Sequence, residues 1–481
     1  MKNRAIVWFR RDLRLADNPA LRAAVDGDFE AIVPVFIHAP DELGQWAPGG
    51  AQRVWLHQSL CALAQELEHL GSRLVIRTGP TQDTLDTLIE ESGATAVFWN
   101  RLYDPAEIER DKAVKQNLAD RGDLEVASFK AHLLHEPWTV ETKQGDPYKV
   151  FTPYWKNIRQ REIGKLLPRP ASLPEVWSRI GSDEIDSLGL LPTLDWDNGI
   201  RQRWTPGEAG AHERLETFLE DAASHYDHDR DYPSVAGTSY LSPHLHWGEI
   251  GPRQVMHRVQ EWLSEQSGEA PRKHIESFQS EIGWREFAHH VLFHFPDTPT
   301  QPLDARFKHF PWENDEDALR RWQRGQTGIP MVDAGMRELW ATGYMHNRVR
   351  MTVASFLTKN LRIAWQDGER WFWDTLVDAD LASNTLGWQW ASGSGADAAP
   401  FFRIFNPARQ GERFDADGAY VRYWVPELKH LEKKHLHKPW DAPAKALKDA
   451  GVELGRTYPQ PMVDLKQSRR EALEAFAQIK S

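Results

Sequence analysis

The sequence predicts an N-terminal α/β domain with a doubly wound parallel sheet, followed by a larger all-α domain. Short apolar segments alternate with segments of helical periodicity up to about residue 130. After residue 206 the strand-like segments stop and helical periodicity continues. The length of 481 residues also exceeds what one hydrophobic core usually serves. We therefore expect an α/β domain at 1–130, a linker at 131–205 and an all-α domain at 206–475.

The first domain is predicted to hold five short buried strands. They lie at residues 5–9, 31–37, 73–77, 95–99 and 124–129. Between them, residues 52–71 and 81–93 have helical apolar spacing. Ligands of such folds bind beyond the carboxyl ends of the strands. The sequence has neither a Gly-x-Gly-x-x-Gly nor a Walker motif, so it does not support ordinary dinucleotide or nucleoside triphosphate binding.

The linker is predicted from scattered prolines and weak periodicity between residues 131 and 205. The all-α domain is predicted from six segments of helical spacing. These segments are 207–226, 253–266, 276–293, 315–325, 332–343 and 347–366.

Composition and charge limit the class of protein. The composition, 41% hydrophobic and 27% charged, is typical of soluble globular proteins. No apolar run is long enough for a membrane span, and the arginine-rich start is no signal peptide. The single cysteine, Cys61, excludes an internal disulfide and indicates a reducing, cytoplasmic location. A net charge of -12 argues against a protein coated in nucleic acid, although a local basic groove stays open.

Two polar motifs have alternative explanations. Residues 237–245, GTSYLSPHL, place hydroxyls near a helix start, where they either hold a phosphate or cap the helix. Asp378 and Asp380 are two residues apart but have no further metal ligand at a suitable spacing. We therefore expect a helix cap or an arginine partner, and no metal. The three histidines within 430–440 are interpreted as a charged connector.

Two helical pairs are candidates for a binding site. Asn347 and Met351 lie four residues apart, and Glu281 and Trp284 lie three apart, so each pair shares a helix face. The 22 tryptophans are mostly expected in the core, with a few stacking on flat ligands or carrying electrons.

Taken together, these stretches resemble the photolyase/cryptochrome family over nearly the whole chain. The resemblance rests on residues 7–21, 237–253, 284–287, 325–339, 342–351, 371–390 and 395–407. It implies an α/β domain, a long linker and a helical domain that holds FAD folded into a U.

The resemblance also implies the flavin-binding residues. The phosphates would be held by Tyr226, Thr238, Ser239, Tyr240, Leu241 and Ser242. Asp378, Ala379 and Asp380 would contact the ribityl and isoalloxazine parts. Asn384 would lie near flavin N5, and Arg350 would pair with Asp378.

The same resemblance assigns several aromatic and basic residues. Trp388, Trp365 and Trp312 would form the electron path from the flavin to the surface. Trp284 and Trp390 would wall the substrate pocket, where pyrimidines stack. DNA contacts would come from Arg230, Arg348, Arg403 and Gln410.

Asn347 and Met351 match the family branch that repairs cyclobutane pyrimidine dimers, whereas the branch that repairs 6-4 photoproducts has histidine at both positions. Glu281 would bond the pyrimidine edge and stabilise its radical anion. The expected activity is blue-light-driven repair of UV-damaged DNA by fully reduced FADH⁻ in a monomer. A cryptochrome-type sensor, a 6-4 photolyase and an unrelated FAD-dependent oxidoreductase are the alternatives. The first of these often has a long C-terminal extension, whereas this chain ends at Ser481.

An antenna chromophore is also expected. Glu107 matches a glutamate that contacts folate in relatives, which favours methenyltetrahydrofolate over deazaflavin. The Cys–Lys pair that contacts folate in some relatives has no counterpart in residues 295–308.

Overall fold

The structure is a computed structural model that describes residues 3–176 and 179–480. They form two compact units, one of Met1–Ser224 with Ser239–Pro296 and one of His225–Thr238 with Asp297–Ser481. The boundaries of these units differ from those expected at residues 130 and 205. The division into an α/β domain, a linker and an all-α domain remains a prediction. None of the described helices is long and apolar enough to cross a lipid bilayer.

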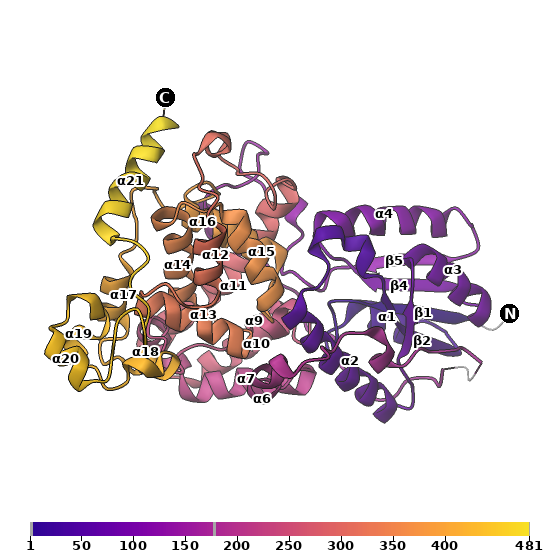
Figure 1. Ribbon diagram of the computed structural model, residues 1–481. Coiled ribbons are helices and arrows are strands. Elements are labelled where there is room, and N and C mark those ends of the chain that lie inside the picture. The colour runs from indigo at the N-terminus through magenta and orange to yellow at the C-terminus, as the bar shows by residue number, and fades with distance from the viewer. Residues whose placement is uncertain (1–2, 177–178, 481) are drawn as a thin grey trace. The chain divides into compact units, whose positions relative to one another are not determined.

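The first unit contains the predicted parallel sheet (Figure 1). Its strands are β1 (Arg4–Phe9), β2 (Ala31–His38), β3 (Val75–Thr78), β4 (Ala96–Asn100) and β5 (Glu125–Phe129). All pairs are parallel, in the order β3-β2-β1-β4-β5. The order reverses between β1 and β4, which is the topological switch point of this sheet. The prediction of a doubly wound sheet is therefore confirmed.

Burial on both faces of the sheet explains why its strands are continuous apolar runs. In β1, all residues after Arg4 are buried, and Ile6 and Trp8 pack with Val97 and Trp99 of β4. Helices α1 (Pro19–Asp26), α2 (Gly50–His69), α3 (Thr81–Ser92) and α4 (Pro105–Ala119) connect the strands. The sequence predicted α2 and α3 but missed α1 and α4. Only three residues of α4 are buried, so its apolar period is weak.

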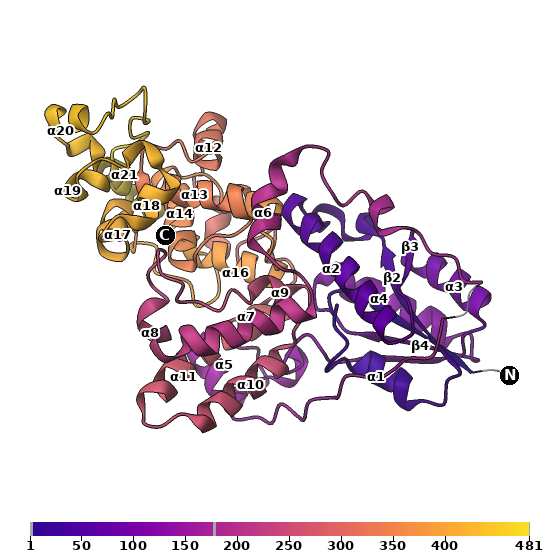
Figure 2. The same cartoon turned by 90° about the horizontal axis from the view of Figure 1, so that it is seen from below.

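The rest of the first unit combines helices with irregular segments. It contains α5 (Phe151–Ile158), α6 (Asn198–Arg203), α7 (Glu208–Asp221), α9 (Ser242–His246), α10 (Pro252–Glu265) and α11 (Ala270–His294). Helix α11 packs against α5 and α10, and α10 packs against α7 (Figure 2). The expected linker thus includes two short helices, α5 and α6, which are too short to give a sustained period.

A buried glutamate fixes the start of the expected linker to α11. The Glu286 carboxylate accepts hydrogen bonds from the backbone N–H groups of Leu134, at 2.9 Å, and His135, at 3.1 Å. Burial raises the pKa of Glu286, and the neighbouring Arg285 opposes this. Arg285 in turn donates to the carbonyl oxygen of His132 at 2.8 Å. The chain is therefore held closely at the point where the sequence suggested a loose connector.

The second unit contains only helices among its described elements. They are α8 (Tyr226–Asp229), α12 (Glu316–Gln323), α13 (Pro330–Thr342), α14 (Asn347–Ser355), α15 (Trp365–Thr375), α16 (Leu381–Ser392), α17 (Pro407–Phe414), α18 (Ala419–Trp424), α19 (Lys433–Leu436), α20 (Ala444–Asp449) and α21 (Leu465–Gln478), with the π-helical η7 (Phe356–Asn360) and short 3-10 turns. This agrees with the predicted all-α region.

The prediction of one helix over 347–366 is wrong. Helix α14 passes into η7, and the helical path then ends before α15 begins at Trp365. The backbone of Arg362 has a φ of 51°, in the left-handed region. The next residue, Ile363, forms a bridge with Glu313. This long-range pairing overrides the helical periodicity of the segment.

Candidate flavin and substrate site

The start of α14 orients the first pair of candidate residues. Gly343 ends α13 with a φ of 67°, which favours glycine. His346 then caps α14, since its Nδ1 accepts the backbone N–H of Arg348 at 3.2 Å. Asn347 is exposed and Met351 is half-buried, one turn apart on the same helix. The predicted shared face is therefore present, and it is accessible.

A second side chain of α14 forms the predicted ion pair. Nη2 of Arg350 donates to the two carboxylate oxygens of Asp378 at 2.8 and 3.1 Å, and its Nε donates to the Met345 carbonyl at 2.7 Å. The Asp378 side chain is 2% exposed. Burial opposes the charged form of Arg350, but Asp378, with further contributions from Tyr344 and Glu338, outweighs this effect and raises the pKa of Arg350.

Asp380 has the other role expected of this acidic turn. Its carboxylate accepts the backbone N–H of Ser383 at 2.9 Å and caps α16. An arginine partner and a helix cap thus account for the two aspartates. The buried Ala379 lies between them in the chain.

Asn384 lies on the first turns of α16 and is fixed by α15. Its Nδ2 donates to the backbone carbonyl of Glu369 at 3.0 Å. The adjacent Thr385 donates through its hydroxyl to the Glu369 carboxylate at 2.5 Å. Sequence reasoning missed Glu369 because a glutamate in a charged helical segment is ordinarily a surface residue.

The three tryptophans of the expected electron path differ in exposure. Trp388 and Trp365 are buried on α16 and α15, two helices that pack together. Trp312 is partly buried beside Phe310, with ring centroids 4.4 Å apart. A gradient from buried to accessible indoles fits a path that ends at solvent.

We expect Gly368→Ala to destabilise the protein and displace Trp388. A Cβ at Gly368 would lie 2.1 Å from Cη2 of Trp388, so the outer edge of the indole lies directly against this glycine. Overpacking of this kind costs about 1–3 kcal/mol. Thermal unfolding measures the loss. Gly387→Ala on α16 is the matched control, because a Cβ there meets nothing within 4 Å. Alanine also has a higher helix propensity than glycine, so this variant should not be destabilised. Equal midpoints for the two variants would contradict this packing.

The residues expected to hold phosphates belong to both units. Tyr226 is buried on α8, and Arg230 stacks on its ring with Cζ 5.1 Å from the centroid. Thr238 closes this stretch of the second unit, whereas Ser239, Tyr240, Leu241 and Ser242 belong to the first unit. Among the described residues, the buried hydroxyl oxygen of Thr238 has no hydrogen-bond partner. Such an orphaned hydroxyl fits a phosphate oxygen.

The plain capping explanation of this motif is not supported. Helix α9 has only five residues, its N-cap is Leu241, and no side chain caps it. Of these hydroxyls, that of Ser239 accepts the backbone N–H of Leu241 at 3.4 Å, before the helix begins, and that of Thr238 has no partner among the described residues. Within the second unit, the Thr238 hydroxyl, the Asn384 amide and the Arg350–Asp378 pair form a donor set that fits FAD.

Glu281 and Trp284 lie on α11 of the first unit, as predicted. The Trp284 ring stacks on Phe151 with centroids 3.9 Å apart and an interplanar angle of 10°. Both Glu281 and Trp284 are partly exposed. Gly283 between them has no side chain because the Trp155 ring lies against it, 2.5 Å from an added Cβ. Phe151 thus covers one face of the Trp284 indole, and the side chain remains partly exposed.

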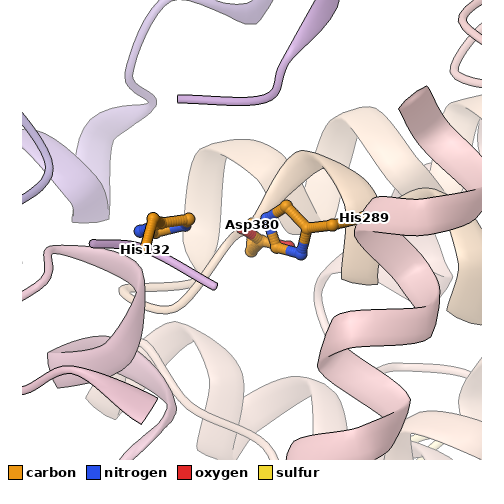
Figure 3. A group of neighbouring side chains, drawn as sticks. All are labelled: His132, His289 and Asp380. Atoms are coloured by element: carbon orange, nitrogen blue, oxygen red, sulfur yellow. The ribbon is translucent and has the colours of Figure 1, made fainter. Parts of the chain in front are cut away.

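One turn beyond Trp284, α11 packs against the linker through histidines. The rings of His132 and His289 lie 5.3 Å apart at 72° (Figure 3). Nδ1 of His289 bonds the carbonyl oxygen of Arg285 at 3.0 Å. Figure 3 also labels Asp380, the α16 cap of the second unit. The two histidines reinforce the contact that positions α11.

The candidate DNA contacts differ in availability. The Arg348 guanidinium pairs with Asp231 and stacks on Phe414, with Cζ 4.4 Å from the ring centroid. The positive charge of Arg348 is therefore already balanced by Asp231. The sequence did not reveal this partner. Arg403 is exposed and Gln410 is half-buried. Trp390 is half-buried and stacked near Phe405, with centroids 6.5 Å apart.

Glu107 lies in the first turn of α4 and is 5% exposed. Its carboxylate accepts from Arg11 at 2.5 Å, beside the Arg11–Asp104 pair at 2.9 Å. The carboxylate is thus engaged within the α/β fold, and its contact with a folate stays a prediction.

Comparisons with known proteins agree with this architecture. Residues 5–174 match the family described as DNA photolyase, and residues 278–478 match the FAD binding domain of DNA photolyase. The chain is 50% identical over 479 residues to the deoxyribodipyrimidine photo-lyase of Agrobacterium fabrum, covering 99% of this chain and 98% of that protein. It is 41% identical to cryptochrome-2 of Arabidopsis thaliana, covering 100% of this chain and 80% of that protein. The crystal structure of a bacterial class III photolyase from Agrobacterium tumefaciens aligns with a TM-score of 0.95 and 49% identity, covering 100% of this chain and 98% of that one. The chain therefore belongs to the DNA photolyase/cryptochrome family.

Proposed function

We propose that this protein is a deoxyribodipyrimidine photo-lyase that repairs cyclobutane pyrimidine dimers in DNA under blue light. The observation that carries the proposal is the arrangement of α14. Its accessible side presents the Asn347 amide and the Met351 thioether, and the same helix contributes Arg350 to the ion pair with Asp378. One short helix thus serves both the lesion and the flavin.

The 6-4 photoproduct alternative is disfavoured by the histidine of this segment. That chemistry needs a protonated histidine at the lesion. Burial, helped by Arg348, lowers the pKa of His346 to about 4, so this imidazole is neutral at physiological pH. Its Nδ1 is also occupied by the α14 cap. His346 is therefore a structural residue and no proton donor.

FAD, when bound in its reduced form, supplies the electron that opens the cyclobutane ring. The protein holds and orients the reactants. Tyr226, Thr238 and the following hydroxyls would hold the phosphates, and Asp378 with Arg350 would hold the ribityl and ring region. Asn384 would bond the flavin edge near N5. Glu281 would accept a hydrogen bond from the pyrimidine edge, or donate one to it.

Damaged DNA is the proposed partner. The dimer leaves the helix and enters the site, a step for which photolyases are themselves a standard example. Trp284 and Trp390 would stack on the pyrimidines, at about 1–3 kcal/mol per base. Arg230, Arg403 and Gln410 would contact the strand, and Arg348 would do so by exchanging Asp231 for a phosphate. A methenyltetrahydrofolate antenna, a monomeric state and a cytoplasmic location complete the proposal.

The decisive experiment uses purified, chemically reduced protein and DNA that carries either cyclobutane dimers or 6-4 photoproducts. We expect loss of cyclobutane dimers under blue light and none in the dark. Equal loss in the dark would contradict the light-driven mechanism, and loss of only 6-4 photoproducts would contradict the assigned lesion. Similarity to Arabidopsis cryptochrome-2 supports a second candidate, a blue-light sensor. Flavin photoreduction without repair of either lesion would favour that candidate.

Trp312→Phe should separate flavin photoreduction from repair. Trp312 is the accessible end of the proposed electron path, and phenylalanine is much harder to oxidise than tryptophan. We expect photoreduction of oxidised flavin to slow at least about tenfold, which corresponds to about 1.4 kcal/mol in the barrier. Repair by chemically reduced enzyme should stay unchanged, which serves as the internal control. Loss of repair in the reduced enzyme would show that Trp312 has another role.

A further inference from the structure

Glu369 is a buried carboxyl group that the proposed mechanism does not use. It lies on α15 and is 0% exposed. Its Oε1 accepts the Thr385 hydroxyl at 2.5 Å, while its Oε2 has no hydrogen-bond partner among the described residues. Buried carboxylates ordinarily have charged or multiple partners. This incomplete pairing calls for an explanation other than a structural ion pair.

The backbone of Glu369 sets the orientation of Asn384. Because its carbonyl oxygen accepts Nδ2 of Asn384 at 3.0 Å, the amide nitrogen is engaged and Oδ1 remains the acceptor end of that side chain. Thr385, the next residue on α16, holds the carboxyl group of the same glutamate. Two adjacent residues of α16 are therefore tied to one residue of α15.

The same turn of α15 also seats Trp388. Gly368, which precedes Glu369, lies so close to the indole that an added Cβ would be 2.1 Å from it. The position of this turn thus determines both the Asn384 amide and the Trp388 ring. Asn384 is the residue proposed to lie beside flavin N5, and Trp388 is the first tryptophan of the proposed electron path.

We propose that Glu369 is a positioning residue of the flavin site: its backbone carbonyl holds Asn384, and its carboxyl group holds Thr385 and so fixes the turn of α15 that seats Trp388. This inference rests on the proposed function, which places Asn384 beside the flavin. Glu369 touches neither flavin nor substrate in this assignment, and acts through Asn384 and Trp388.

The charge state of Glu369 makes this role testable. Burial raises its pKa to about 8, and the Thr385 hydroxyl and Arg370 only partly oppose this. Arg370 is itself bound to Asp367 at 2.5 Å. Two further cations belong to nearby segments of the chain. Lys359 lies on η7, which packs against α15, and the charge of Arg350 is balanced by Asp378. Glu369 is therefore neutral at pH 7, and ionises in the fold only as the pH passes about 8.

The sign of the pH effect follows from linkage. The pKa of Glu369 in the fold is above its ordinary value of 4.5, so the stability it contributes is complete below pH 4.5 and is lost progressively up to about pH 8. Glu369→Gln keeps the shape and an acceptor for Thr385 but cannot ionise. We expect its thermal midpoint to exceed that of the wild type by an amount that grows from pH 5 to pH 8 and then levels. The exposed Glu316→Gln, with a side chain 75% exposed, is the control and should give a constant difference.

Positioning requires a second readout, taken on the flavin-loaded protein. We expect the rate of flavin photoreduction to fall as the pH passes about 8 in the wild type and to be level in Glu369→Gln, because a buried charge opposes electron arrival nearby. Glu369→Ala should slow photoreduction about tenfold at pH 7, because it leaves the Thr385 hydroxyl unpaired. Glu369→Gln should restore the rate.

The outcomes separate this inference from the repair function. Identical pH profiles in wild type and Glu369→Gln, or no loss in Glu369→Ala, would overturn the positioning role while repair stands. The expected profiles in a protein that repairs no lesion would support the positioning role and overturn the proposed function.

Discussion

Exchanging both Asn347 and Met351 for histidine is expected to lower dimer repair about a hundredfold while the fold and the flavin are retained. Both side chains are accessible on α14, so their replacement should change the free energy of unfolding by less than about 0.5 kcal/mol. The amide can accept and donate neutral hydrogen bonds, and the thioether packs softly against an irregular ligand. Two imidazoles titrating near pH 6.5 would replace both functions with proton donors. Two lost contacts of about 1.4 kcal/mol each correspond to about a hundredfold loss of repair.

The measurement is the yield of repaired dimers per absorbed photon in chemically reduced protein. The matched control is the double substitution Glu474→His and Gln478→His, which has the same spacing on exposed positions of α21. It should repair at the wild-type level. Retained repair in the α14 variant, with normal flavin content, would show that the lesion does not contact this face.

Sequence reasoning found the sheet because its strands carry their own signal. A strand buried on both faces must be apolar throughout, as β1 and β4 are, and this is visible without knowledge of the partners. It failed where long-range contacts decide the local structure. The break after η7 depends on the left-handed backbone of Arg362 and on the pairing of Ile363 with Glu313, which lies fifty residues earlier in the chain. The helical periodicity of 347–366 contains no sign of it.

The same distinction applies to the candidate site. The Arg350–Asp378 pair followed from the family resemblance, and Asn347 and Met351 followed from helical spacing. The partner of Arg348, Asp231, and the partner of Asn384, Glu369, are remote in sequence and have no motif around them. Their roles arise from which helices pack together, and periodicity does not encode that.

The largest effect on stability is expected from Asp378→Ala. Removing the carboxylate leaves the Arg350 guanidinium without its ion-pair partner, and its bond to the Met345 carbonyl and its contact with the Tyr344 ring remain. Loss of one partner of a buried pair costs about 3–5 kcal/mol, because the remaining charge is no longer compensated. Denaturant unfolding should show this as a lower midpoint with an unchanged slope, and the flavin should be lost during purification.

Two further variants identify the cause. Glu313→Gln weakens a more exposed ion pair, in which the Glu313 carboxylate, 51% exposed, bonds Arg362. This substitution should lower the free energy of unfolding by less than about 1 kcal/mol. Adding Arg350→Met to Asp378→Ala removes the uncompensated charge and should recover much of the lost stability, without recovering flavin binding. A double variant as unstable as Asp378→Ala alone would mean that the aspartate acts through the local backbone. A double variant that also regains the flavin would mean that neither side chain holds it, and the site around α14 would need to be placed elsewhere.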